Sequence, residues 1–300
     1  MMRLPSPERE WFLMLLKFLK ISFLGLFLAC AITATSWAGT ATIDATTTNQ
    51  IIQGFGASSA WHESTFASGL ATWFWDATDT VVSGGVTSAS GIGMSLLRCH
   101  IPYTNTTTSI SDPGETAVMK QAINLGVTQV WCTEWAPPNN DRSAGSTWGS
   151  SNNDFLGAAS GTPNGNDTDY ASYLVNYIKY ANTQIASTGV QVLAVSPQNE
   201  PDWNPTYEGN EWTAGQFDVF VGAFYSALQT AGLSTKIMIP ESFADSASLA
   251  ATTMDDATNA PKVAFIGNHL YGLNGATPYS LSGAGFTQVT NQESWETEMS

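Results

Sequence analysis

Apolar and polar residues along this chain alternate in segments that predict strands and helices in turn. Apolar, β-branched runs near residues 54, 94, 128, 191, 236, 263 and 295 predict seven buried strands. Helical spacing of apolar residues, with capping residues before it or glycine after it, predicts helices near 64–83, 115–125, 167–189, 213–232 and 244–258. Strands that alternate with helices at this pitch predict parallel βα units.

The predicted fold class is therefore α/β, of the (β/α)₈ TIM-barrel type, over residues 54–300. A doubly wound sheet is the alternative, but it usually has a glycine-rich phosphate turn after its first strand. The only such feature here, Gly54-Phe55-Gly56, lacks the third glycine. Before the barrel, residues 40–44 and 50–53 alternate polar with apolar positions and predict two short strands of an antiparallel sheet.

The N-terminal segment has the organisation of a secretory signal peptide. Four basic residues precede an apolar run at 21–34, and Ser36-Trp37-Ala38 places small residues at a cleavage site. We expect residues 1–38 to be removed after Ala38 and the protein to be secreted. An uncleaved anchor is the alternative, although the run is short for a membrane span. A lipoprotein anchor at Cys30 fits less well, because Phe27 suits the motif poorly.

Composition narrows the function classes. Charged residues make up only 12% of the chain, there are 11 Trp, and the net charge is −15. This acidic balance argues against binding to nucleic acid or anionic membranes. Cys99 and Cys132 lie in apolar strand runs and are expected as two buried thiols, with a disulfide as the alternative. The histidines are isolated from one another and from the cysteines, so no metal or other cofactor is expected.

The candidate chemistry lies where the predicted strands end, since active sites of barrel enzymes lie at the carboxyl ends of the strands. Any one of these residues alone has an ordinary structural explanation, such as packing for a Trp or an ion pair for an Arg. Together, carboxylates, one Arg and several indoles around one cleft suit carbohydrate, because indoles stack on the C–H faces of sugar rings. The set is Trp61, Arg98, His100, Trp135, Asn199, Glu200, Trp203, Glu241, His269, Tyr271 and Glu298.

Two of these carboxyl groups fit the cleavage of a glycosidic bond. Glu200 follows the fourth predicted strand and Glu298 the seventh, so we expect them to face each other across the barrel mouth. Retaining glycosidases hold their two carboxyl groups about 5–5.5 Å apart. We assign Glu200 as acid/base, kept protonated by the negative charge of its partner, and Glu298 as nucleophile. Arg98 and the Tyr271 hydroxyl are expected to keep Glu298 ionised.

The chain resembles glycoside hydrolase family 30, within the clan A group of retaining (β/α)₈-barrel glycosidases. An Asn-Glu-Pro alone would indicate only the clan, whereas an ordered set of motifs spanning residues 40–300 is specific. These motifs are Gly54-Phe-Gly-Ala-Ser-Ser-Ala-Trp61, Gly93-Met-Ser-Leu-Leu-Arg98, Trp135-Ala-Pro-Pro138, Ser196-Pro-Gln-Asn-Glu-Pro-Asp202, Pro240-Glu-Ser242, His269-Leu-Tyr-Gly272 and Trp295-Glu-Thr-Glu298.

The resemblance implies the same two catalytic roles and adds substrate contacts. It implies that Asn199 binds the sugar 2-hydroxyl and that Arg98, Trp135, His269 and Tyr271 line the cleaved subsite. We place Trp61 and Trp203 among the substrate-binding residues as well. The motif forms are most similar to those of the xylanase branch, which implies an endo-β-1,4-xylanase acting on plant-wall xylan or glucuronoxylan. We expect the protein to be a monomer. The alternatives are a glucosylceramidase-like β-glucosidase, an endo-β-1,6-glucanase or galactanase, and, in another class, an inactive carbohydrate-binding relic.

The resemblance also implies parts that this sequence does not contain. The family's barrel has eight strands and a β-sandwich side domain built mostly from sequence after the barrel. This sequence ends two residues after Glu298. We therefore expect an incomplete gene product, with residues 39–53 contributing N-terminal strands to the side domain and residues 54–300 forming a barrel that lacks its eighth βα unit.

Overall fold

The computed structural model describes residues 46, 51–78, 80–83, 86–103, 110–138, 163, 165–203, 205, 207–271 and 280–299. The chain divides into two compact units, Met1–Ile52 and Gln53–Ser300. The predicted signal segment 1–38 and the predicted strand at 40–44 lie outside the described residues. Of the strand predicted at 50–53, residues 51–53 are described and lie in no strand. The elements below all belong to the second unit.

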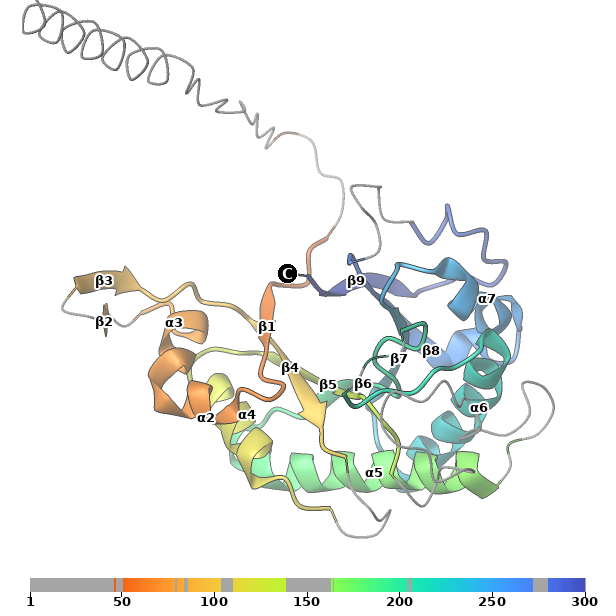
Figure 1. Ribbon diagram of the computed structural model, residues 1–300, viewed down its shortest axis with the longest axis horizontal. Helices are drawn as coiled ribbons and strands as arrows, with labels where there is room; N and C mark the ends of the chain where they lie inside the picture. The colour runs from red at the N-terminus through yellow and green to blue at the C-terminus, as the bar shows by residue number, and fades with distance from the viewer. Residues whose placement is uncertain are drawn as a thin grey trace, which may run out of the picture. The chain divides into compact units, whose positions relative to one another are not determined.

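Seven strands form one curled sheet in the order β1-β4-β5-β6-β7-β8-β9 (Figure 1). Each neighbouring pair in this sheet is parallel. The prediction of a parallel barrel-type α/β fold is therefore confirmed, and all carboxyl ends of the strands lie on one edge of the sheet. The strands are β1 (Gly56–Ser58), β4 (Leu96–Ile101), β5 (Gln129–Glu134), β6 (Val192–Ser196), β7 (Lys236–Ser242), β8 (Val263–His269) and β9 (Glu293–Glu298).

Four helices connect consecutive strands and cover the outer face of the sheet (Figure 1). Thr213 begins one of them with a capping box to Gln216, and Gly232 ends it in the left-handed region at φ 67°. Asp112 begins another by accepting a hydrogen bond from the Glu115 N–H, with Pro113 at the first helical position. The four are α4 (Pro113–Asn124), α5 (Gly165–Ile185), α6 (Ala214–Ala231) and α7 (Ala247–Asp255), with short turns η3 (Ala186–Thr188) and η4 (Ala260–Lys262).

The helix predicted over 64–83 is wrong in its second half. Helical structure runs through α2 (Glu63–Thr65), η1 (Phe66–Leu70) and α3 (Ala71–Trp75), and the chain then forms an antiparallel pair, β2 (Thr80–Ser83) with β3 (Val86–Ser90). Asp76 ends the helix because its Oδ1 accepts the Thr78 N–H at 2.7 Å in a local turn. The β-branched pair Val81-Val82 then favours a strand over a further helical turn.

Two apolar layers hold the sheet in place. The larger lies between the sheet and the helices and includes Leu97, Tyr177, Phe220 and Ile239. The smaller fills the inside of the curl with Trp131, Ala194, Met238 and Phe265, against which Trp295 packs. Cys99 and Cys132 are in register on β4 and β5, and both are buried free thiols, so the alternative of a disulfide is not realised.

Tyrosine hydroxyls of α5 tie this outer helix to the loops at the carboxyl ends of the strands. Tyr170 donates to the Pro197 carbonyl at 2.5 Å, and Tyr173 donates to the Pro102 carbonyl at 2.7 Å. Since both tyrosines are buried, these bonds are shielded from water and fix the loops that follow β4 and β6.

Candidate active site

The loop after β6 is built to present one carboxylate. The Asn199 N–H donates to the Glu134 carbonyl at 2.8 Å, and the Gln198 side-chain amide donates to the Trp135 carbonyl at 2.8 Å. These bonds tie the loop to the end of β5. Pro197 and Pro201 keep the intervening residues out of a helix, so Glu200 stands at the carboxyl edge of the sheet.

Glu200 adopts an uncommon backbone conformation. Its φ is 47°, in the left-handed region that a non-glycine residue adopts only when its surroundings enforce it. The Glu200 N–H donates to the Glu241 carbonyl at 3.0 Å, and its side chain is hydrogen-bonded to His269 Nδ1 at 3.0 Å. Only 6% of Glu200 is exposed. The carboxyl group is therefore held from both its backbone and its side chain.

Glu298, at the end of β9, is held as an anion. Arg98 Nη1 donates to one carboxylate oxygen, and the Tyr271 hydroxyl donates to the other at 2.8 Å. Burial by itself would raise the pKa of Glu298, but the positive charges of Arg98 and then His269, together with the Tyr271 hydrogen bond, outweigh it. The pKa of Glu298 is thus below its ordinary value, and the group is ionised at neutral pH.

Arg98 is the centre of the site. This buried guanidinium, from β4, donates to the Asn199 Oδ1 at 2.6 Å and lies 3.1 Å from the Glu241 carboxylate, in addition to its bond with Glu298. Its Nε donates to the Thr133 hydroxyl at 3.3 Å. Because Arg98 occupies the acceptor oxygen of Asn199, the amide N–H₂ is the part of Asn199 that remains to meet a ligand.

Two further buried groups share this charge network. The pKa of Glu241 is lowered to about 2, because Arg98, then His269, overcome the opposing effect of burial. The Thr133 hydroxyl also donates to Glu241, at 2.8 Å. Burial would lower the pKa of His269, yet its hydrogen bond with the Glu200 carboxylate raises it, as does the Glu241 carboxylate 3.6 Å from its Nε2. The site therefore alternates negative and positive groups, which lets several charges persist out of water.

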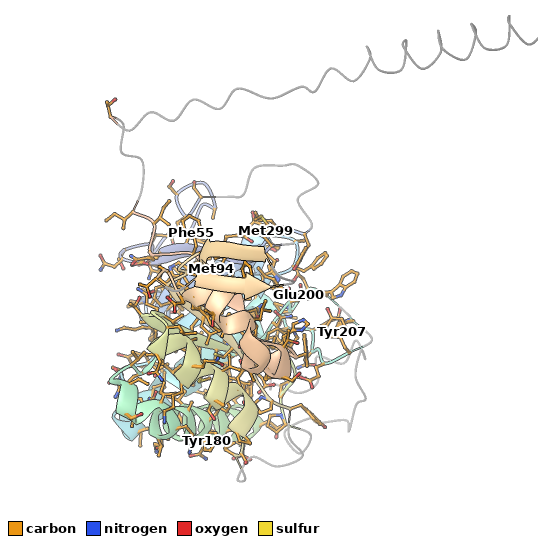
Figure 2. The ribbon with its side chains drawn as sticks, turned by 90° about the vertical axis from the view of Figure 1, so that its left-hand side faces the viewer. Phe55, Met94, Tyr180, Glu200, Tyr207 and Met299 are labelled. Carbon is orange, nitrogen blue, oxygen red and sulfur yellow. The ribbon has the colours of Figure 1, made fainter. Side chains whose placement is uncertain are left out.

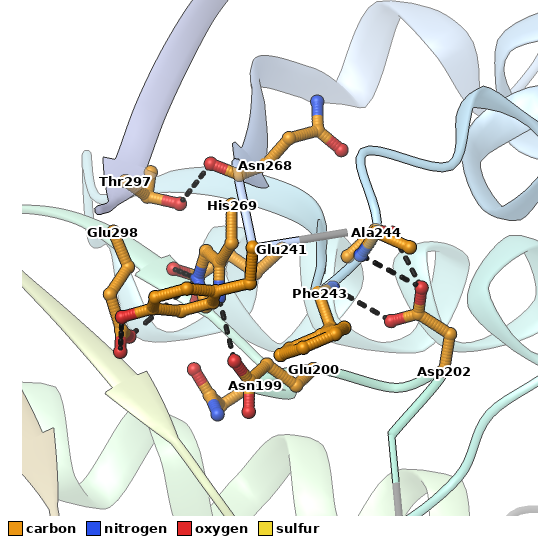
Figure 3. A network of polar contacts seen from close by, with 12 residues as sticks. Asn199, Glu200, Asp202, Glu241, Phe243, Ala244, Asn268, His269, Thr297 and Glu298 are labelled. Carbon is orange, nitrogen blue, oxygen red and sulfur yellow. Dashed lines mark hydrogen bonds and ion pairs between the residues drawn. The ribbon is translucent and has the colours of Figure 1, made fainter. Parts of the chain in front are cut away.

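The two predicted carboxylates face each other at close range (Figure 3). Oxygen atoms of Glu200 and Glu298 and a ring nitrogen of His269 all lie within 4.8 Å of one another. This upper limit is closer to the carboxyl separation of retaining glycosidases, about 5–5.5 Å, than to that of inverting ones, about 6.5–9.5 Å.

One aromatic cluster borders the site on the β4–β5 side. Trp61 lies 5.1 Å from both His100 and Trp135, and His100 lies 5.0 Å from Trp135, measured between ring centroids. Trp135 is buried and covers the Arg98 guanidinium at 4.6 Å, whereas Trp61 is 50% exposed. The half-exposed indole is thus the member of this cluster that can contact a ligand.

Tyr207 extends this cluster toward the acidic residues. Its ring lies 5.9 Å from Trp61, and Figure 2 shows Tyr207 on the same side of the protein as Glu200. Burial raises the pKa of the Tyr207 hydroxyl, and so do the negative charges of Glu200 and then Glu298. The hydroxyl is therefore neutral and can act as a hydrogen-bond donor near Glu200.

A second aromatic group lies after β6 and β7. Trp203 stacks on Phe243 with ring centroids 4.7 Å apart and an interplanar angle of 17°. Phe243 in turn stacks on Tyr271 at 5.4 Å, and Tyr271 is the residue that donates to Glu298. Trp203 is 43% exposed. It offers a flat apolar face next to the carboxylate pair, as a sugar ring requires.

Glu200, His269 and Glu298 could also hold a metal ion, because each offers one ligand atom and these atoms lie close together. Arg98 argues against that use, because its guanidinium bonds to Glu298 and would repel a cation there. The expectation of a site without metal or other cofactor remains a prediction.

The structure brings Arg98, Asn199, Glu200, His269, Tyr271 and Glu298 into one hydrogen-bonded network, with Trp61, Trp135 and Trp203 around it. The sequence placed Glu241 among the residues expected around the cleft but assigned it no specific role. It missed Thr133, Tyr207 and Phe243. The signal for Thr133 was present, since it lies two residues before Trp135 at the end of a predicted strand, but threonine is common in strands.

A parallel barrel-type sheet that carries two facing carboxylates at its carboxyl edge is typical of a glycoside hydrolase. Residues 69–265 match the family model of O-Glycosyl hydrolase family 30. This match covers more than half of the sequence, so the chain belongs to this family.

Known proteins with similar sequence or structure include xylanases of this family. The Bacillus subtilis glucuronoxylanase XynC is 25% identical over 281 residues, which are 91% of this chain and 57% of that protein. The family 30 subfamily 8 xylanase Xyn30A of Clostridium acetobutylicum is 27% identical, with a TM-score of 0.58 over 83% of this chain and 56% of that one. A Clostridium papyrosolvens C71 endoxylanase is 25% identical, with a TM-score of 0.56 over 83% and 57%. The chain thus spans little more than half the length of these relatives.

Proposed function

We propose that the protein is a retaining β-glycosidase whose substrate is β-1,4-xylan or glucuronoxylan. The observation that carries the proposal is the pair of carboxylates, Glu200 and Glu298, whose oxygens lie within 4.8 Å of each other. The fixed ionisation of Glu298 by Arg98 and Tyr271 adds to it, since a nucleophile must be deprotonated before substrate arrives.

In the first step, Glu298 attacks the anomeric carbon while Glu200 transfers its proton to the leaving oxygen. This gives a covalent glycosyl ester on Glu298 and releases the aglycone. His269 occupies one oxygen of Glu200, which leaves the other oxygen for the proton. In the second step, Glu200 removes a proton from water, the water oxygen attacks the anomeric carbon, and Glu298 departs as a carboxylate.

The substrate class rests on two supports. Two aromatic groups, around Trp61 and around Trp203, belong to the same site as the carboxylates and can stack on sugar rings. The relatives named above are called xylanases or a glucuronoxylanase, at 25–27% identity. The remaining substrates to be tested are glucosylceramide-like β-glucosides and β-1,6-glucan.

The N-terminal segment supports export as part of the proposal. Basic residues, an apolar run at 21–34 and small residues before Ala38 are typical of a cleaved signal peptide. In the part of the chain that the structure describes, every helix is too short or too polar to cross a bilayer. Sequencing the N-terminus of the protein recovered from the culture medium tests the export directly, and Gly39 is the expected first residue.

Turnover of xylan, glucuronoxylan, β-1,6-glucan and an aryl β-glucoside, measured side by side, tests the substrate. We expect the highest kcat/KM on one of the two xylans. Glu298→Ala should lower kcat by more than about 10⁴-fold while xylan binding is retained, and Glu200→Ala should lower it by about 10²–10⁴-fold. Binding without turnover in the unmutated protein would instead favour a carbohydrate-binding relic, and preference for another glycan would refute the xylan assignment.

A further inference from the structure

The loop after β6 carries, besides Glu200, a second acidic residue that bonds to the neighbouring turn. Asp202 accepts three hydrogen bonds from the turn after β7 (Figure 3). The Ser242 hydroxyl donates at 2.7 Å, the Phe243 N–H at 2.8 Å and the Ala244 N–H at 3.3 Å. One exposed carboxylate thus satisfies two backbone donors and one side-chain donor of the same turn.

That turn determines where the acid/base lies. The carbonyl of Glu241, which precedes the turn, accepts the Glu200 N–H at 3.0 Å. Glu241 has φ 54° and Glu200 has φ 47°, so both partners of this bond are in the left-handed region. Non-glycine residues persist there only when neighbouring contacts hold them. A movement of the turn would release this pair and with it the carboxyl group of Glu200.

The turn also supports the second aromatic group. Phe243, whose N–H bonds to Asp202, lies between Trp203 and Tyr271 in a continuous stack. Since Tyr271 donates to Glu298, the turn contacts residues beside both predicted catalytic carboxylates.

We propose that Asp202 is a positioning residue for the acid/base, which acts by fastening the turn 242–244 and so fixing Glu200 and the Trp203–Phe243 stack. The proposal rests on the proposed glycosidase function. Asp202 is exposed, and exposed polar contacts add little stability, so its removal should alter catalysis much more than folding.

The test compares Asp202→Asn with a matched control, Asp255→Asn. Asp255 also accepts a backbone N–H from another segment, that of Thr287 at 2.8 Å, at the end of α7 and outside the site. In Asp202→Asn an amide N–H₂ replaces one oxygen and meets a donor. Both variants lose one negative charge and one or more hydrogen bonds to backbone.

The kinetic measurement distinguishes misplacement of the Glu200 carboxyl group from a general loss of active-site structure. A dinitrophenyl leaving group departs without a proton, whereas the sugar alcohol released from xylan needs one. We expect Asp202→Asn to lower kcat/KM on xylan by about 10²-fold, but on 2,4-dinitrophenyl β-xylobioside by less than about 3-fold. Asp255→Asn should change neither. An equal loss on both substrates, or no loss on xylan, would overturn the proposal.

Amide hydrogen exchange tests whether Asp202 holds the turn 242–244 in place, without requiring turnover. In Asp202→Asn, the amides of Phe243, Ala244 and Glu200 should exchange faster than in the unmutated protein, and those in Asp255→Asn should not. If the protein hydrolyses no β-glycan, the proposed function fails while exchange still decides the role of Asp202. Unchanged exchange at these three amides would refute the proposal whatever the activity.

Discussion

Two buried glutamates at the carboxyl edge of the sheet differ in charge at neutral pH: Glu241 is ionised and Glu115 is protonated. Glu241, at the end of β7, and Glu115, in the first turn of α4, are 0% and 1% exposed. The pKa of Glu241 is lowered to about 2, and that of Glu115 is raised to about 8. Burial acts in the same direction on both, so the difference comes from their neighbours.

The neighbours of the two glutamates differ in charge. Arg98 lies 3.1 Å from Glu241, whereas among the described residues the donors to Glu115 are neutral: the Ser59 hydroxyl and the His100 N–H at 3.1 Å. Burial raises the pKa of Glu115 most, and the negative charges of Asp112 and Glu63 raise it further against the Ser59 hydrogen bond. A carboxyl group stays ionised out of water only where a cation is built in beside it. The Arg98 network is therefore arranged for charge, and Glu115 is a neutral structural group.

Removing the Arg98 cation should have the largest effect on stability. Among the described residues, Arg98→Met leaves the Glu241 and Glu298 carboxylates with His269 alone as a nearby cation. We expect a loss of about 3–5 kcal/mol in the free energy of unfolding at pH 7. Denaturant titration measures it. The double variant Arg98→Met/Glu241→Gln should recover part of the loss, because one of the uncompensated charges is gone. A single variant as stable as the unmutated protein would contradict the central place given to Arg98.

Glu241→Gln should have the next largest effect on the free energy of unfolding, and this effect should depend on pH. Because the folded-state pKa of Glu241, about 2, lies below its ordinary value of 4.5, ionised Glu241 stabilises the fold above the ordinary value. That stability is lost as pH falls toward about 2. The variant should therefore be less stable than the unmutated protein by about 2 kcal/mol near pH 6. The gap should close as acid is added, and a gap that is constant with pH would show that charge is not its source.

Glu115→Gln should change the pH dependence of stability with the opposite sign. A raised folded-state pKa means that the folded protein keeps a proton that the unfolded chain has lost, so stability falls as pH rises from 4.5 toward about 8. The variant carries no such proton. Relative to the variant, the unmutated protein should lose about 2 kcal/mol between about pH 5.5 and pH 7.5. Parallel stability curves for the two proteins would refute a neutral Glu115.

Much of the fold was predictable because its signals are local. The seven strands and the α6 boundaries, from Thr213 as N-cap to Gly232, follow from β-branched runs and capping residues. The hairpin β2–β3 was missed because aromatic and valine residues at 73–82 also fit a helical stripe. There, the local turn at Asp76 decides the outcome.

The members of the site were predictable from strand ends, but their partners were not. Arg98 was expected beside Glu298, yet its contacts with Glu241 and Asn199 depend on the register of β4 relative to β7 and on the loop after β6. The burial of Glu115 depends on how α4 packs on β4. Such tertiary contacts join residues 101 to 143 positions apart in sequence, or two separate elements, and leave no periodic pattern.

The proposed mechanism makes Glu298 the nucleophile of a retaining glycosidase whose acid/base is Glu200. The most direct measurement is trapping with 2,4-dinitrophenyl 2-deoxy-2-fluoro-β-xylobioside, followed by peptide mapping by mass spectrometry. The fluorine slows hydrolysis of the glycosyl ester, and the activated leaving group lets it form. We predict one fluoroxylobiosyl group per protein, on the peptide that contains Glu298, and none in Glu298→Gln. A label on Glu200 or elsewhere, or no label in a protein that still hydrolyses xylan, would contradict the assignment of Glu298 as nucleophile.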